Sequence, residues 1–82
     1  MKFKNQKAIY AWRKALIYEK GYLSLKYDLK LAVEKQLNEP VDYNLMGKVL
    51  RGERGPGPSA RKIRWAISRL LGKPEGHLWP GR

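Results

Sequence analysis

Apolar side chains recur at helical spacing over two stretches in the first half of the chain. Residues 7–20 form the first stretch, and Gly21 follows as a residue suited to ending a helix. Its apolar positions are Ile9, Trp12 and Leu16. The second stretch begins at Ser24, which can cap a helix, and runs to Leu37, and Pro40 disfavours helix just beyond it. The pattern predicts two amphipathic helices joined by a short turn.

Two further helical stretches follow. Asp42 is a suitable N-cap for a short third helix that ends at Gly52. An irregular loop rich in glycine and proline is expected over residues 53–58, after which Ser59 is expected to cap a fourth helix ending at Gly72. The apolar positions that we expect to face inward are Met46, Val49 and Leu50 in the third helix and Ile63, Ala66, Ile67, Leu70 and Leu71 in the fourth.

The two ends of the chain lie outside these helices. Residues 1–6 are expected to form a short flexible N-terminus, and residues 73–82 a C-terminal tail with a half-turn near its start. The tail carries Leu78 and Trp79, which either make a dimer contact or close over the core, and the nearness of a small core favours the second. No stretch shows the alternation of a strand, so the predicted fold class is all-α: one compact domain, 1–82, of four to five helices.

The balance of charges adds an expected partner. The chain has 18 Lys and Arg residues against 7 Asp and Glu, a formal net charge of +11. Residues 1–20 and 61–82 each carry six basic residues and one acidic residue, whereas residues 21–40 carry three of each. A charge this far from zero opposes compaction and is typical of a protein with an anionic partner. Because hydrophobic residues make up 43% of the chain, disorder does not explain the charge.

The inventory of reactive residues argues against an enzyme. The chain has no cysteine and a single histidine, His77, with no second ligand at metal-binding spacing. The glycines between Gly52 and Ser59 resemble a phosphate loop, but Pro58 stands where the lysine of that loop belongs. The lack of cysteine and of any membrane-length apolar stretch is typical of cytoplasmic proteins. We therefore expect no catalysis, metal, cofactor or membrane partner, and a cytoplasmic location.

The third helix carries side chains suited to duplex DNA. Tyr43, Asn44 and Lys48 fall on one exposed turn. Asparagine can bond adenine bidentately, lysine can reach guanine or phosphate, and tyrosine can contact a thymine methyl group or a phosphate. Gly47 leaves the helix bare beside them, which lets its backbone come close to a groove. The alternative is a polar helix face that is merely solvated, and the spacing itself does not separate the two.

The order of the predicted parts resembles a known family. From Val41 to Trp79, a short helix ends in Arg51-Gly52, a loop follows, and the next helix closes on Leu71-Gly72. This order resembles the helix-turn-helix family of Cro and the phage repressors, and the ending over residues 71–82 is similar to that of Ner-like regulators of transposable phages. The stretch from Ser24 to Gly52 is longer than that family usually has, so we expect an enlarged second helix or turn.

The resemblance implies a site for duplex DNA on the third helix. That helix would be the recognition helix, with Tyr43, Asn44 and Lys48 at the base-reading positions. The phosphate-binding residues implied by the resemblance are Ser24, Lys26, Arg51, Arg54, Arg61 and Lys62. They would position the domain without reading sequence. The base-reading positions depend more strongly on the enlarged turn, because its angle decides how deep the third helix can sit in a groove.

The function that follows is sequence-specific binding of double-stranded DNA by a small repressor of phage or mobile-element type, in a bacterial cell or a phage-infected host. A homodimer on a pseudo-palindromic site is one expected form. The alternative is a protein-interaction module that docks on RNA polymerase or a recombination complex through exposed aromatic residues. The candidates for that patch are Tyr10, Tyr18, Tyr22, Tyr27 and Trp65, several of which are expected to complete the core instead.

Overall fold

The computed structural model describes residues 6–53 and 57–79, except for the side chains of Gln6, Leu25 and Lys26. The helices are α1 (Gln6–Glu19), α2 (Lys30–Leu37), α3 (Tyr43–Arg51), α4 (Pro58–Leu71) and α5 (Glu75–Leu78), and a π-helical turn, η1 (Leu25–Leu29), leads directly into α2. These ranges contain no strand, and the all-α prediction is confirmed. No helix in them has both the length and the apolar character needed to cross a membrane.

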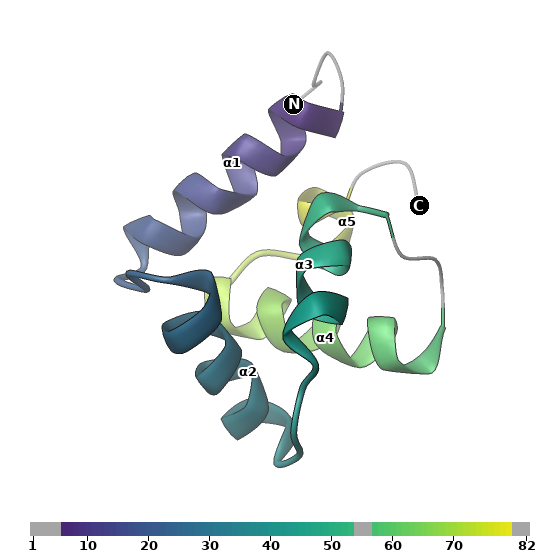
Figure 1. The fold of residues 1–82 in the computed structure, drawn as a ribbon. Coiled ribbons are helices and arrows are strands. Elements are labelled where there is room, and N and C mark those ends of the chain that lie inside the picture. Colours follow the sequence, from purple (N-terminus) through teal and green to yellow (C-terminus); the bar gives the residue numbers. More distant parts are fainter. Residues whose placement is uncertain (1–5, 54–56, 80–82) are drawn as a thin grey trace.

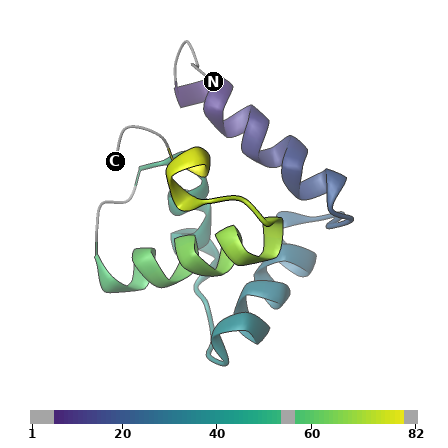
Figure 2. The same cartoon turned by 180° about the vertical axis from the view of Figure 1, so that it is seen from behind.

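Helix α4 is the element against which α2, α3 and α5 pack. Both α2 and α3 pack against α4, α3 also packs against α1, and α5 folds back onto α4 (Figure 1). Figure 2, the view from behind, shows α4 and α5 in front of α3. Helices α2 and α3 therefore contact α4 more extensively than they contact each other. As a result, α3 has one side against α1 and α4 and another side open.

Two of the predicted helix caps are formed. The Ser24 hydroxyl accepts a hydrogen bond from the Tyr27 amide at 3.0 Å. The Asp42 carboxylate accepts hydrogen bonds from the amides of Asn44 and Leu45, each at 3.3 Å. Such caps satisfy amides in the first turn that have no partner within the helix. These side chains therefore define where two of the helices begin.

Two other boundaries differ from the prediction. Helix α4 begins at Pro58, with Gly57 in the N-cap position, so Ser59 is not its cap. Proline is well suited to the first turn because its missing N–H would be unpaired there in any case. The predicted half-turn in the tail is the start of a short helix, α5, which follows Pro74.

The second helical segment begins with a turn of π geometry. The Leu29 amide donates to the carbonyl oxygen of Ser24, five residues earlier, at 3.0 Å. Such π geometry accommodates an extra residue in a helical turn. Together η1 and α2 form one helical segment from Leu25 to Leu37. The extra residue of the π turn therefore lies at the N-terminal end of this segment.

A single carboxylate closes the connection between α2 and α3. Helix α2 ends at Asn38, whose φ of 56° lies in the left-handed region that usually favours glycine. Glu34 Oε2 accepts a hydrogen bond from the Val41 amide at 2.9 Å and pairs with Lys30 Nζ at 3.0 Å. The Val41 amide, and next the Lys30 ammonium, lower the pKa of Glu34. Ionised Glu34 thus helps to determine where α3 begins relative to α2.

The core corrects the prediction for the inner face of α1. The buried positions of α1 are Ile9, Arg13 and Ile17, while Trp12 and Leu16 are only partly buried. The centre of the face is thus an arginine, a residue that apolar periodicity assigns to the surface. The main cluster of buried apolar residues is Ile17, Leu29, Val33, Val41, Met46, Val49, Leu50, Ala60, Ile63, Ala66, Ile67, Leu71, Leu78 and Trp79. The last two residues of this cluster, Leu78 and Trp79, belong to the C-terminal tail, so the prediction that the tail closes over the core is confirmed.

Candidate nucleic-acid interface

The open side of α3 carries the three predicted base-reading residues. Asn44 and Lys48 are exposed and lie one helical turn apart. Tyr43, at 38% exposure, lies beside them in the first turn. The buried residues of α3 are Met46, Val49 and Leu50. The predicted division of this helix into an inward and an exposed side is therefore confirmed.

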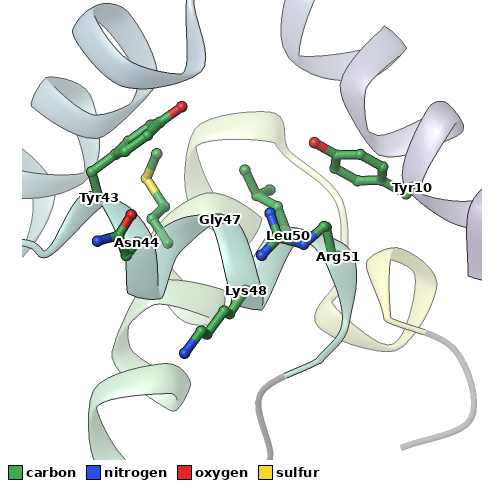
Figure 3. Close-up of a pocket in the computed structure, with 8 residues that line it drawn as sticks. Tyr10, Tyr43, Asn44, Gly47, Lys48, Leu50 and Arg51 are labelled. Atoms are coloured by element: carbon green, nitrogen blue, oxygen red, sulfur yellow. The ribbon is translucent and has the colours of Figure 1, made fainter.

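A hollow of about 290 Å³ lies beside this side of α3, where α1 approaches it (Figure 3). Its lining residues are Tyr10, Tyr43, Asn44, Met46, Gly47, Lys48, Leu50 and Arg51. Figure 3 shows Tyr10 and Tyr43 on either side of Gly47, with Lys48 pointing away from the hollow. The ammonium of Lys14 lies 5.4 Å from the centre of the Tyr10 ring. Helix α1 therefore adds an aromatic ring and a cation that the sequence reasoning missed; the high charge of residues 1–20 was the only signal.

Gly47 leaves room for Arg51 to lie back along α3. A Cβ atom at position 47 would be 3.3 Å from Arg51 Nη1. The Arg51 guanidinium also forms an ion pair with Glu53, just beyond the helix. The hydrogen bond to Glu53 raises the pKa of Arg51. Arg51 therefore lies on the predicted side of α3, and Glu53 is the acceptor that a phosphate would have to replace.

Two buried side chains anchor the C-terminal end of α3. The Arg13 guanidinium donates to the carbonyl oxygens of Leu50 and Leu78 and lies 5.3 Å from the centre of the Trp79 ring. The Trp79 indole donates to the Val49 carbonyl oxygen at 2.8 Å. The last carbonyls of a helix have no partner within it and carry the negative end of its dipole, so a cation and a donor are well placed there. These bonds tie α3 to α1 and α5 in one orientation.

Arg61 and Lys62 do not join the exposed side of α3. The buried side of α4 packs against α2 and α3, and both residues lie on the opposite, exposed side of that helix. Trp65 and Arg69 are exposed on the same outer side, and Lys62 Nζ lies 3.3 Å from a carboxylate oxygen of Glu39. Arg61 and Lys62 therefore do not extend the exposed side of α3, and their predicted contact with the same duplex stays a prediction.

Ser24, another predicted phosphate ligand, is engaged within its own helical segment. The hydroxyl of Ser24 serves as a helix cap, and the adjacent amide of Leu23 donates to the Asp28 carboxylate at 2.7 Å. A carboxylate thus lies at the helix start where a phosphate was expected. The side chain of Lys26 and the whole of Arg54 lie outside the described residues.

Part of the positive charge is inside the molecule. Arg13 is 2% exposed and Arg64 is 7% exposed. Arg64 Nε lies 3.8 Å from Glu75 Oε1, an ion pair that links α4 to α5. Two of the basic residues that contribute to the net charge of +11 therefore hold helices together.

Among residues 6–53 and 57–79, no three His, Cys, Asp or Glu side chains gather as the ligands of a metal would, and His77 is exposed on α5.

Comparisons of the chain with models of protein families, with curated proteins and with solved structures find no match. The resemblance to the phage repressors therefore rests on the sequence motifs, and the case for a function rests on the surfaces described above.

Proposed function

We propose that this chain binds double-stranded DNA through the exposed side of α3, as a small repressor of phage or mobile-element type in the cytoplasm of a bacterial cell or an infected host. The observation that carries the proposal is the row formed by the exposed side chains of Asn44 and Lys48, beside Gly47, where the Arg51 side chain lies along the helix. An amide and an ammonium at that spacing can read adenine and guanine edges in the major groove. No catalytic step, metal or cofactor enters the proposal.

The dimensions and mounting of α3 support this role. An α-helix with its side chains is about 10–12 Å across, which fits a major groove about 12 Å wide, and the 9 residues of α3 give it a length of about 13 Å. Tyr43 and Asn44 lie at its N-terminal end, the part of a recognition helix that meets base edges in repressors of this type. Arg13 and Trp79 fix the C-terminal end of α3 before DNA binds. The helix therefore loses little conformational entropy when it enters a groove.

The cations around α3 set the expected dependence on salt. Lys14, Lys48 and Arg51 lie on or beside its open side. Each phosphate that a cation neutralises adds about −0.9 to the slope of log K against log salt concentration. These three residues together predict a slope of roughly −3 for duplex binding. A slope near zero would contradict binding through this side.

Selection from random duplex DNA at physiological salt tests the proposal directly. The chain should enrich a motif, and Asn44→Ala should relax the preference at one or two base pairs, at a cost of about 1–3 kcal/mol. Arg61→Ala is the matched control, since Arg61 is exposed on the far side of α4. It should leave both the motif and the salt slope unchanged. Failure to enrich a motif, or equal effects of the two variants, would refute the proposal.

A protein-interaction module is the second candidate, favoured by exposed apolar side chains around the start of α2. Leu23 is 84% exposed, Tyr27 67% and Leu31 58%, and Tyr18 near the end of α1 is 48% exposed. Tyr10 and Tyr22 pack against the core and Trp65 lies on α4, so the predicted aromatic residues do not form one patch. The exposed apolar side chains near the start of α2 and the end of α1 suit contact with another protein.

A second copy of the chain is the occupant that this apolar surface fits. Residues 21–40 carry three basic and three acidic residues, so here two chains of net charge +11 would repel each other least. Sedimentation equilibrium should detect a dimer, and Leu31→Lys should convert it to a monomer. A wild-type chain that stays monomeric would contradict the homodimer. A contact with RNA polymerase or a recombination complex stays a prediction.

A further inference from the structure

The outer side of α4 forms a second basic surface that the proposed function leaves unused. We call it the α4 surface and define it by Arg61, Lys62, Trp65 and Arg69, all of them exposed. Positions 61, 65 and 69 follow one another at intervals of four residues, about 6 Å apart along the helix. The surface is therefore a row of arginine, tryptophan and arginine with a lysine beside it.

The tryptophan in this row is in contact with a cation and open to a hollow. The guanidinium carbon of Arg69 lies 5.4 Å from the centre of the Trp65 ring, which is 44% exposed. The ring also lines a hollow of about 470 Å³, together with Pro58, Arg61, Lys62 and Glu75. That volume is within the range of roughly 300–1,000 Å³ found for small-ligand sites. A flat ring could therefore stack on Trp65 from the hollow, with arginine on both sides.

The charges around Trp65 favour an anion. Within the described part of the chain, neither Arg61 nor Arg69 has an ion-pair partner. Lys62 shares its charge with Glu39, and the carboxylate of Glu75 at the hollow is offset by the buried Arg64. Two guanidinium groups thus flank an exposed aromatic ring without a neutralising carboxylate.

We propose that the α4 surface binds single-stranded nucleic acid, with one base stacked on Trp65 and neighbouring phosphates held by Arg61 and Arg69. An unpaired strand can turn a base face toward an aromatic side chain, whereas a duplex keeps its base faces inside the stack. An acidic peptide would satisfy the arginines but has no base for Trp65. The surface is formed by α4 and its neighbours on the far side from α3, so this inference does not depend on duplex binding by α3.

Fluorescence anisotropy of a labelled oligothymidylate tests the inference on the full chain. Base stacking on an aromatic side chain is lost when that side chain is truncated, so Trp65→Ala should weaken binding by at least about fivefold. Trp65→Phe, which keeps a ring, should recover most of the affinity. Arg61→Ala and Arg69→Ala should each flatten the salt slope by about 0.7. Since all three side chains are exposed, circular dichroism should show unchanged folding.

Three comparisons decide the outcome. Asn44→Ala, on α3, should leave oligothymidylate binding unchanged. Unchanged affinity in Trp65→Ala would overturn the inference. So would equal competition by polyglutamate, because that result would make the α4 surface a site for acidic protein. Failure of the α3 proposal would show separately, as the absence of a duplex motif while the single strand still binds.

Discussion

Gly47 is the position where fold stability and DNA binding should move in opposite directions. It lies inside α3 with no left-handed backbone, so Gly47→Ala removes a helix penalty of about 0.8–1.0 kcal/mol. The new Cβ would lie 3.3 Å from Arg51 Nη1, the tip of a flexible side chain that can shift at small cost. The net gain should be about 0.5–1 kcal/mol, which corresponds to a rise in Tm of roughly 2–8 °C in a domain of this size.

The same methyl group should weaken binding to duplex DNA. It would stand on the side of α3 proposed to enter the groove, where it keeps the helix backbone away from the base edges and displaces Arg51. We expect the affinity for the selected motif to fall about tenfold, equivalent to about 1.4 kcal/mol. Loss of folded protein cannot explain weaker binding by a variant that is more stable than the wild type. The two effects together therefore test whether the exposed side of α3 contacts DNA.

Thermal denaturation and duplex anisotropy on the same preparation measure both effects. Gly76→Ala is the matched control, since Gly76 lies in α5 and its added Cβ would meet open space. It should leave duplex affinity unchanged. A lower Tm for Gly47→Ala would refute the packing argument, and a raised Tm with unchanged affinity would refute the placement of α3 in the groove.

Three further substitutions test the anchors and charges of the site. In Arg13→Lys, a single ammonium replaces the guanidinium that donates to two carbonyl oxygens, so the free energy of unfolding should fall by about 1–3 kcal/mol. Urea denaturation measures it, and an unchanged value would contradict the role of Arg13 in holding α3. Glu53→Gln releases Arg51 from its ion pair, so duplex affinity should rise, whereas a weaker complex would contradict the competition. The Val41 amide lowers the pKa of Glu34, so the stabilisation from this carboxylate is complete above its ordinary pKa and is lost as the pH falls through the lowered one. On acidification from about pH 5 to about pH 3, the Tm of Glu34→Gln should fall less than that of the wild type, and parallel curves would remove this role.

The short-range features of the fold could be predicted because their causes lie within a few residues. Asp42 bonds to amides two and three positions later, and Gly52 and Gly72 end their helices in the left-handed conformation that glycine adopts at no steric cost. The inner and outer sides of α3 follow from the period of a single helix. For that reason Asn44 and Lys48 were correctly assigned to its exposed side.

The position of Arg13 could not be predicted from periodicity. An arginine at the centre of a helix face costs free energy unless carbonyl oxygens meet its guanidinium. Those oxygens belong to Leu50 and Leu78, which lie 37 and 65 positions away along the chain. The sequence contains the arginine and both acceptors but not the approach of α1, α3 and α5 that brings them together.

The sequence by itself determined which segments are helical, where most of them end and which side of α3 and of α4 faces the core, because these depend on bonds and spacing within one segment. The tertiary structure decided which exposed side chains share a surface. Packing of α1 against α3 brings Tyr10 to the side of α3, and packing of α4 against α2 and α3 leaves Arg61 and Lys62 on the outer side of α4. The physical reason is that a surface is composed of residues from several helices, and their relative placement follows from long-range contacts in the core.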